Sequence, residues 1–395
     1  MVNSKMHQLG TTRSVIREIF EYGNRRKAEI GADKVFDFSL GNPSVPAPEI
    51  VNESIKNILA DMDAAVLHGY TSAQGDASVR KALADNLNER FGTDFKADNL
   101  YVTVGAAAAL MSAIRGLCEE NDEFIAISPF FPEYKVFVEA AGGKLVVVPA
   151  EKPSFQIDLT ALRAAITDNT KAVIINSPNN PCGVVYTEKT IKELSALLKE
   201  ESDKRGEPIF LIADEPYREL VYDAATEVPY VTKYYDDTIV CYSFSKSLSL
   251  PGERIGYVLV SDKVTGSKDV YAAVCGAGRA LGYVCAPSLF QRVAAACAGK
   301  TADISIYKTN RDLLYNALSD MGFECVYPDG AFYLFVKAME EDAAAFCEKA
   351  KKYELLLVPG DDFGCPGYVR ISYCVQTEMI KNSLPAFEKL AKEYK

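Results

Sequence analysis

This chain has little histidine and no tryptophan. Its 395 residues include two histidines, His7 and His68, and no tryptophan. Three histidines cannot be gathered round a zinc ion, and a facial triad with two histidines would use both of them, so we predict no metal site. A serine–histidine–aspartate relay would depend on His7, close to the N-terminus, or on His68. If the protein is an enzyme, we expect a side chain other than imidazole to carry its protons.

The sequence also lacks the patterns that are typical of disulfide-bonded, membrane-spanning and nucleic-acid-binding proteins. The ten cysteines include no C-x-x-C pair, which is typical of free thiols in a reducing compartment. The first ten residues lack the apolar core of a signal peptide, and no apolar run approaches the roughly 18 residues of a membrane span. The net charge of −11 disfavours a nucleic-acid partner, which needs a clustered positive field. We expect a cytoplasmic protein without nucleic-acid or membrane partners.

The residues that are present describe a globular chain. Hydrophobic residues make up 48% and charged residues 25%, and the length indicates roughly two domains. From about residue 75, short apolar runs alternate with helical stretches. Continuous apolar strands separated by helices predict an α/β fold with a mostly parallel, seven-stranded sheet covered by helices on both faces. The expected strands are 100–104, 124–127, 145–148, 172–175, 209–213, 238–242 and 257–260.

The pattern changes after about residue 285. A helical stretch over 287–319 precedes alternating strands at 323–327, 332–336, 355–358 and 368–373, which predict a smaller α+β domain. Near the N-terminus, glycine and proline in residues 41–48 exclude regular structure. We therefore expect three parts: an N-terminal arm and loop over 1–48, a large domain over 49–285, and a small domain over 286–395 that the N-terminal segment joins.

Two motifs resemble known sites but lack the necessary context. Residues 276–282, Gly-Ala-Gly-Arg-Ala-Leu-Gly, resemble a dinucleotide-binding turn, yet the expected last glycine is Leu281 and no strand precedes them. Residues 243–246, Ser-Phe-Ser-Lys, match the S-x-x-K of penicillin-binding enzymes, yet the companion S-D-N and K-T-G elements are absent. We adopt neither interpretation.

Polar motifs follow four of the expected strands. Ligands of open α/β sheets bind beyond the carboxyl ends of the strands, so these motifs are expected to meet in one crevice. A surface lysine is the ordinary alternative for Lys246, but its companions disfavour that alternative. The motifs are Gly105-Ala106-Ala107-Ala108, which opens a helix suited to phosphate, Asn176 to Gly183, Asp214-Glu215-Pro216-Tyr217, and Lys246 with Arg254 eight residues later.

Together these motifs resemble a known family. The patterns S-x-S-K-x₇-R, D-x-P-Y and N-P-x-G, in this order and spacing, are similar to those of the fold-type I, pyridoxal-phosphate-dependent aminotransferases of class I/II, aspartate aminotransferases among them. The resemblance runs from the Gly-Asn-Pro segment at residue 41 to Arg370. It implies pyridoxal 5′-phosphate as the cofactor, amino acids and 2-oxo acids as substrates, and a homodimer with shared active sites.

The resemblance implies a role for each cofactor-binding residue. Lys246 would form the internal Schiff base and then carry the proton between substrate and cofactor, so that no histidine is needed. A cationic neighbourhood should lower the basicity of its amine. Asp214 would pair with the pyridine nitrogen, and Tyr217 and Asn180 with the ring oxygen. Phe131 would stack on the ring, with core packing as its alternative, and the phosphate would be held by Gly105, Ala106, Ala107, Ser243, Ser245 and Arg254.

Other residues would contact the substrate or the partner subunit. Arg370 would grip the α-carboxylate in a bidentate manner, with a surface arginine as its alternative. Gly41 and Asn42 fit the loop that closes over the substrate. Tyr70 fits the tyrosine that reaches the phosphate of the neighbouring subunit's cofactor; its alternative is a buried tyrosine with a satisfied hydroxyl.

The chain departs from the family pattern at three positions. Cys182 replaces the common threonine of the N-P-T-G motif, a small change that should spare Asn180. Ala107 stands where one bacterial aspartate-using branch has a lysine that reads the distal carboxylate of the substrate. Arg279 lies about two residues from the position of an arginine that serves this purpose from the partner subunit in another branch; its alternative is a surface arginine.

We therefore expect an aminotransferase. An aspartate-like donor with 2-oxoglutarate is the first hypothesis, and aromatic or alanine-type donors are alternatives. The same residues could also serve a β-eliminating C–S lyase. A regulator that keeps this fold would need a DNA-binding domain, and only about forty residues precede the Gly-Asn-Pro loop.

Overall fold

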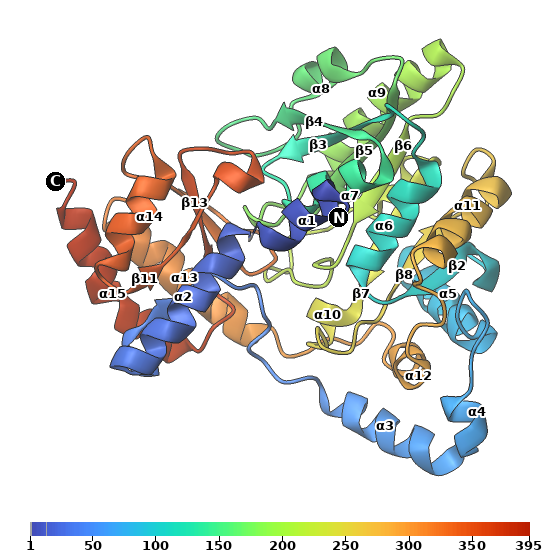
Figure 1. Cartoon of the computed structure of the whole chain (residues 1–395), viewed down its shortest axis with the longest axis horizontal. Coiled ribbons are helices and arrows are strands. Elements are labelled where there is room, and N and C mark those ends of the chain that lie inside the picture. Colours follow the sequence, from blue (N-terminus) through green and yellow to red (C-terminus); the bar gives the residue numbers. More distant parts are fainter. Residues whose placement is uncertain (1, 13) are drawn as a thin grey trace.

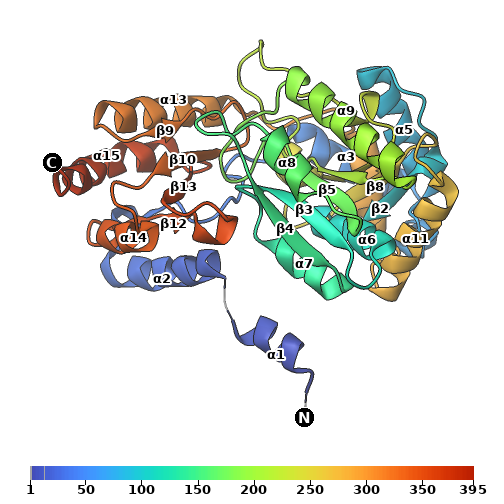
Figure 2. The ribbon, with the colours of Figure 1, turned by 90° about the horizontal axis from the view of Figure 1, so that it is seen from above.

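The computed structural model describes residues 2–12 and 14–395. Met1 and Arg13, which fall within the expected N-terminal arm, lie outside the described residues. The chain forms a large unit round one sheet and a smaller unit that contains both α2 (Val15–Ile30) and α15 (Thr377–Lys392) (Figure 1). The helix α1 (Ser4–Thr11) projects from the body, as Figure 2 shows.

The large unit is built on a seven-stranded sheet with the order β2-β8-β7-β6-β5-β3-β4. Only β8 runs antiparallel to its neighbours, so the expected mostly parallel sheet is confirmed. The strands are β2 (Leu100–Thr103), β3 (Glu123–Ser128), β4 (Lys144–Pro149), β5 (Thr170–Asn176), β6 (Phe210–Asp214), β7 (Thr238–Ser243) and β8 (Gly256–Val260).

Side chains alternate between two apolar layers along each strand. On β5, Val173 and Ile175 face one cluster while Ala172 and Ile174 face the other. Both faces of the sheet are therefore buried along its central strands, which explains why those strands are mostly apolar, whereas the edge strand β4 is partly exposed. The first layer is covered by α5 (Ala77–Phe91), α8 (Leu159–Ala165), α9 (Glu188–Arg205) and α12 (Ser288–Ala296), the second by α6 (Ala106–Leu117), α7 (Glu133–Ala141) and α11 (Ser267–Ala280) (Figure 2).

The smaller unit joins the two ends of the chain. Its antiparallel sheet has the order β12-β13-β10-β9, and the N-terminal β1 (Phe36–Asp37) pairs in parallel with β11 (Leu355–Leu356). The expected α+β unit with an N-terminal contribution is thus present. Its other elements are α13 (Ser305–Asp320), β9 (Cys325–Val326), β10 (Tyr333–Lys337), α14 (Ala343–Lys351), β12 (Val358–Pro359) and β13 (Tyr368–Ser372).

The helix α12 changes the boundary that the sequence predicts. The expected helical stretch over 287–319 is two helices, α12 and α13, with Ala302 between them donating its amide to the Ser247 carbonyl. Val293 and Ala294 of α12 pack in the core of the large unit, against α3 (Glu49–Asp61) and α5. The expected boundary at 285/286 therefore separates α12 from the core that it belongs to, and we place the boundary near residue 300.

Within residues 276–282, Gly278 serves helix packing. Gly276 and Gly278 lie inside α11, so this segment is no strand-to-helix turn. A Cβ at Gly278 would approach the Tyr101 hydroxyl to 2.1 Å, which means that the missing side chain lets α11 lie against β2. Within the described ranges, the helices are too short or too polar to span a membrane.

Candidate active site

Three neighbouring strands deliver polar side chains to one edge of the large sheet. Asn176 ends β5, Asp214 ends β6 and Ser243 ends β7, and these strands are parallel neighbours. A cavity of about 310 Å³ lies at this edge, where the two units meet. It brings together most of the predicted site residues, namely Gly41, Ala106, Ala107, Phe131, Asn180, Asp214, Tyr217, Ser243, Ser245, Lys246, Arg254 and Arg370.

Lys246 lies on the short helix α10 (Phe244–Ser247), which begins directly after β7. Its Nζ donates a hydrogen bond to the Gly41 carbonyl at 2.7 Å and so touches the N-terminal loop. Burial lowers the pKa of this amine to about 8, with Arg254 and Arg370 acting in the same direction and Cys374 against it. The sequence argument assigned the loss of basicity to neighbouring cations, whereas desolvation is the larger cause.

Asp214 is a buried carboxylate with one free oxygen. Its Oδ2 accepts a hydrogen bond from the Tyr134 hydroxyl at 2.6 Å, and its backbone carbonyl accepts one from Asn176 Nδ2 at 2.8 Å. Its Oδ1 is buried and has no hydrogen-bond partner in the part of the chain that the structure describes. Burial raises the pKa of the carboxyl to about 7, and the bond from Tyr134 opposes that shift. A cationic N–H donor would satisfy both the free oxygen and the ionised form, so this site fits a protonated pyridine ring.

An anion cradle lies between β2 and α10. Gly105 precedes α6 with a φ of 87°, and a Cβ there would approach Arg254 Nη2 to 2.6 Å. Glycine therefore lets the guanidinium lie against the N-terminus of α6, where backbone amides carry positive charge. Arg254 Nη1 donates to Ser245 Oγ at 3.3 Å, and the hydroxyls of Ser243 and Ser245 are 2.7 Å apart. Two serine hydroxyls, a guanidinium and a helix N-terminus fit a phosphate group.

Arg370 is a buried cation with an unused donor. Its Nη1 donates to Asn180 Oδ1 at 3.1 Å and its Nη2 to the Ser39 carbonyl, while its Nε is buried and finds no partner within residues 2–12 and 14–395. The guanidinium lies between the rings of Tyr333 and Phe363, 4.7 and 5.0 Å from their centroids. Only 2% of the residue is exposed, which excludes the surface arginine that was its alternative. No carboxylate of the described residues pairs with it, so it can receive one from a substrate.

Some predicted residues do not line the cavity. Asn42 and Arg279 are exposed, and Tyr70 is 98% exposed, which excludes the buried tyrosine as its alternative. Both histidines, His7 and His68, are also exposed, and neither belongs to the cavity wall. The roles of Tyr70 and Arg279 were assigned to a neighbouring subunit, so their places on a single chain leave those roles as predictions.

Four further residues contribute to the site although the sequence arguments assigned them no individual role. The side chain of Asn176 links the backbones of Asp214 and Asn180: its Nδ2 donates to the Asp214 carbonyl, and its Oδ1 accepts from the Asn180 backbone amide at 2.7 Å. Its signal was its place at the end of an apolar strand. The other three are Tyr134, which binds Asp214, Tyr333, whose hydroxyl is 2.8 Å from that of Tyr217, and Ile16, which lines the cavity from α2.

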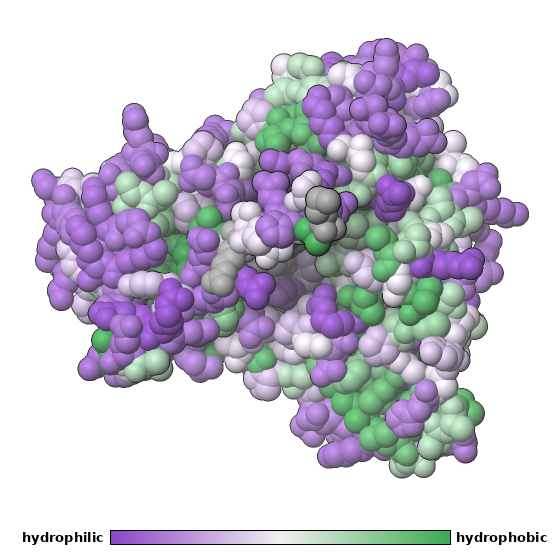
Figure 3. All heavy atoms as spheres, viewed as in Figure 1, coloured by the Kyte–Doolittle hydropathy of each residue, from purple (hydrophilic) through white to green (hydrophobic). Residues whose placement is uncertain are grey.

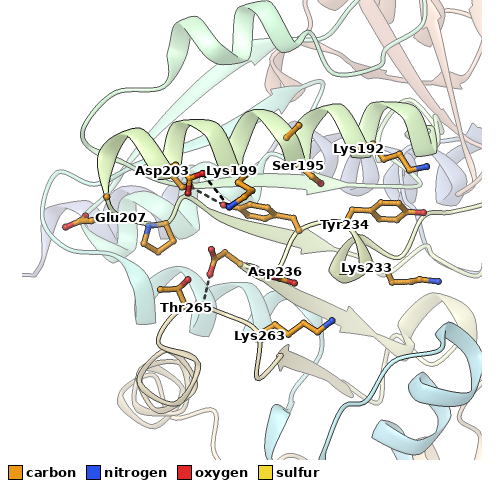
Figure 4. Close-up of a pocket in the computed structure, with 16 residues that line it drawn as sticks. Lys192, Ser195, Lys199, Asp203, Glu207, Lys233, Tyr234, Asp236, Lys263 and Thr265 are labelled. Carbon is orange, nitrogen blue, oxygen red and sulfur yellow. Dashed lines mark hydrogen bonds and ion pairs between the residues drawn. The ribbon is translucent and has the colours of Figure 1, made fainter.

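A larger hollow of about 740 Å³ lies on another face, between α9 and the loops before β7 and after β8 (Figure 4). Lys199 Nζ and Asp203 Oδ2 form an ion pair there at 3.4 Å, and the Thr265 amide donates to Asp237. Lysines and carboxylates alternate round this hollow, so no charge of one sign is concentrated in it. The lining includes Lys192, Lys199, Lys233 and Lys263 together with Asp203, Glu207 and Asp236.

Known proteins resemble this chain over nearly its whole length. The profile of the family described as aminotransferase class I and II matches residues 33–387. An aspartate aminotransferase of Thermotoga maritima is 32% identical over 384 residues, which cover 94% of this chain and 96% of that protein. A solved structure of an amino transferase from Eubacterium rectale is 62% identical, with a TM-score of 0.98 and coverage of 100% and 99%. Thermus thermophilus aspartate aminotransferase with maleate is 25% identical, with a TM-score of 0.86 and 99% coverage of both chains.

Proposed function

The chain belongs to the class I and II aminotransferases, enzymes that work with pyridoxal 5′-phosphate, and we propose that Lys246 is the residue through which it does so. It transfers the amino group of an amino acid to a 2-oxo acid. One observation carries the assignment of the site: a lysine with a lowered pKa, a buried half-free carboxylate, a phosphate cradle and a buried unpaired arginine share one cavity of about 310 Å³.

When bound, the cofactor supplies an electron sink for negative charge at the substrate α-carbon. Asp214 Oδ1 would hold the protonated ring nitrogen, and the hydroxyl of Tyr217 and the amide of Asn180 would hold the ring oxygen. Phe131 would contact the ring, and the amides of residues 105–107 with Ser243, Ser245 and Arg254 would hold the phosphate.

Lys246 Nζ moves the proton. With a pKa of about 8, a fraction of this amine is neutral near pH 7, so it can take the proton from the substrate α-carbon as a base and, as the ammonium that forms, release the same proton as an acid. Arg370 holds the α-carboxylate, which fixes the orientation of that hydrogen toward Lys246. The Gly41 carbonyl accepts a hydrogen bond from Nζ. Closure of residues 41 and 42 over the substrate would exclude water, and it would also change the contacts of the lysine amine.

The active form is a homodimer in our proposal. An apolar area covers α3 and α4 (Ala64–His68), the green area at the lower right of Figure 3, where Leu59 is 53% and Val66 60% exposed. Tyr70 follows α4 by two residues along the chain and is 98% exposed. Large apolar groups and an extended tyrosine on one surface are typical of a subunit interface. We place the enzyme in the cytoplasm, because all ten cysteines are free thiols in the structure.

Tyr70 should bind the partner's cofactor phosphate, and Tyr70→Phe tests that role. Loss of a hydrogen bond to a charged group should raise the dissociation constant of pyridoxal 5′-phosphate roughly tenfold, whereas a surface substitution ordinarily changes little. Cofactor titration by fluorescence measures the constant, and sedimentation gives the oligomeric state. Tyr327→Phe is the matched control, because that tyrosine is also exposed, at 43%, but lies in the smaller unit. Equal cofactor affinity in Tyr70→Phe and wild type would remove Tyr70 from the site.

We propose a small dicarboxylic donor, aspartate-like, with 2-oxoglutarate as acceptor. Similarity to aspartate aminotransferases supports this choice. The three cations in the cavity wall, Lys246, Arg254 and Arg370, already have roles, so a distal carboxylate must be read from outside the chain's own cavity. Arg279 of the neighbouring subunit is the residue that we assign to it. The alternative is an aromatic or other apolar donor, which the apolar wall of Ile16 and Leu110 favours.

A single-turnover screen of amino acids against wild type and Arg279→Ala tests this assignment. In wild type, aspartate and glutamate should convert the cofactor faster than alanine or phenylalanine. Arg279→Ala should lower kcat/KM for the dicarboxylates by about 10- to 100-fold, because a carboxylate loses its charged partner, and should leave alanine unchanged. A wild-type preference for phenylalanine, with no effect of Arg279→Ala, would favour the apolar alternative. Sustained release of ammonia and pyruvate without pyridoxamine build-up would instead indicate a lyase.

A further inference from the structure

Tyr134 makes a contact that the family pattern of the sequence did not predict. It lies in the first turn of α7, eighty residues before Asp214, and its hydroxyl donates to Asp214 Oδ2 at 2.6 Å. Tyr134 is 1% and Asp214 4% exposed. A short bond from a buried phenol to a buried carboxylate is stronger than the same bond in water.

This contact leaves Asp214 with two unequal oxygens. Oδ2 is held by Tyr134, whereas Oδ1 is buried and has no partner among the described residues. Asn176 Nδ2 holds the backbone of the same residue at 2.8 Å. Main chain and one carboxylate oxygen are thus fixed, so the plane of the carboxylate and the direction of Oδ1 are fixed as well.

The other groups round Asp214 cannot replace the phenol. Glu215, next in sequence, is engaged by Arg218, whose Nε donates to Glu215 Oε2 at 2.6 Å. Tyr217 on the following turn and Cys241 on β7 both have their pKa raised by burial and are uncharged. Tyr134 keeps its own proton because burial and the carboxylate raise its pKa well above 10. It is therefore a neutral donor to Asp214 at every pH at which the enzyme works.

The segment that carries Tyr134 also carries Phe131. The Tyr134 amide donates to the Phe131 carbonyl at 3.0 Å, and their rings are in edge contact at 5.8 Å. One turn of the chain therefore places the Phe131 ring in the cavity wall and, through Tyr134, holds the carboxylate of Asp214, which also lines the cavity. A displacement of this turn would move both groups together.

We propose that Tyr134 is the positioning residue for Asp214, aiming Oδ1 at the ring nitrogen of the cofactor and holding the carboxylate in its ionised form. This inference rests on the role proposed for Asp214. Both histidines of this chain are exposed. The hydrogen bond to the Asp214 carboxylate, which an imidazole could also donate, therefore comes from a phenol, whose charge does not change near neutral pH.

Tyr134→Phe tests the proposal, since it removes one hydroxyl and keeps the ring. The dissociation constant of pyridoxal 5′-phosphate should rise roughly tenfold, because a hydrogen bond to an ionised group is lost. The acid limb of the pH profile of kcat should move to higher pH, because Asp214 becomes easier to protonate. Tyr230→Phe is the matched control: Tyr230 is also buried, but its hydroxyl has no hydrogen-bond partner among the described residues, so both readouts should stay at the wild-type values.

A double-mutant cycle with Asp214→Asn separates positioning from packing. In the Asp214→Asn background, Tyr134→Phe should change cofactor affinity less than about twofold, because the charged acceptor is already gone. The same tenfold change in both backgrounds, or no change of affinity and pH profile in Tyr134→Phe alone, would overturn the inference. If Asp214→Asn itself leaves cofactor affinity unchanged, the role proposed for Asp214 fails instead. Thermal melting of the cofactor-free variants confirms that each is folded.

Discussion

Replacing Lys246 by alanine is expected to abolish turnover and the absorbance band of the lysine-bound cofactor. The variant loses the group that attaches the cofactor and the group that carries the proton, so kcat should fall on the order of 10⁴ or more. Absorbance spectra after reconstitution and a single-turnover assay with an amino-acid donor measure the two losses. Lys263→Ala is the control, because that lysine lies on the larger surface hollow of Figure 4 and should not matter to either readout.

Replacing Lys246 by methionine should stabilise the cofactor-free protein. The folded state holds the pKa of Lys246 at about 8, against 10.5 in the unfolded chain, so burial of the protonated amine costs roughly 3 kcal/mol below pH 8. The unfolded state binds more protons between pH 8 and 10.5, so wild-type stability rises with pH across that window. The free energy of unfolding of Lys246→Met should therefore exceed that of wild type by the largest amount at pH 7, and the difference should vanish near pH 10.5.

Urea unfolding of the two cofactor-free proteins at pH 7 and at pH 10 measures this difference. A difference that stays constant between the two pH values would mean that the amine is not desolvated. A Lys246→Ala variant that keeps the absorbance band and its turnover would show that another lysine attaches the cofactor. The two experiments are independent, because the second requires no bound cofactor.

The large sheet was predictable because its strands are buried on both faces. Such strands are continuous apolar runs, and β5 and β6 stand out for that reason. The helix α12 shows where the sequence stops being informative. An amphipathic pattern shows that a helix has a buried face, but not which of two cores covers it, and α12 packs on the core that its place in the chain did not suggest.

The site divides in a similar way. Lys246, Asp214, Arg254 and Arg370 were predictable because each belongs to a motif with fixed spacing. Tyr134 was not, because its role follows from a contact across eighty residues of chain, with no local signal. Tyr333 reads as one apolar position of a strand, and only the folded structure brings its hydroxyl to that of Tyr217. The scarcity of histidine indicated that another side chain would carry the proton, and the cavity wall holds lysine and tyrosine instead of imidazole.

Replacing Arg370 by alanine should weaken every substrate that has an α-carboxylate. The guanidinium is buried, and its Nε has no hydrogen-bond partner among the described residues. A substrate carboxylate that binds there would therefore pair with a desolvated cation. Removing one partner of such a pair costs roughly 2–5 kcal/mol, which corresponds to a fall in kcat/KM of about 30- to 4,000-fold. Steady-state kinetics with several amino acids measures it, and cofactor affinity should stay near the wild-type value.

The informative control for Arg370 is a change of substrate. A primary amine without a carboxylate should react with Arg370→Ala as fast as with wild type in a single turnover, because the lost contact is one that it never makes. Arg370→Lys should recover little of the lost kcat/KM. A lysine cannot reproduce the forked donors of a guanidinium that reach Asn180 and the Ser39 carbonyl, nor its contacts with the Tyr333 and Phe363 rings. Equal losses for the amine and for amino acids would mean that Arg370 acts through the fold of the cavity. Unchanged kcat/KM for amino acids would move the carboxylate site elsewhere.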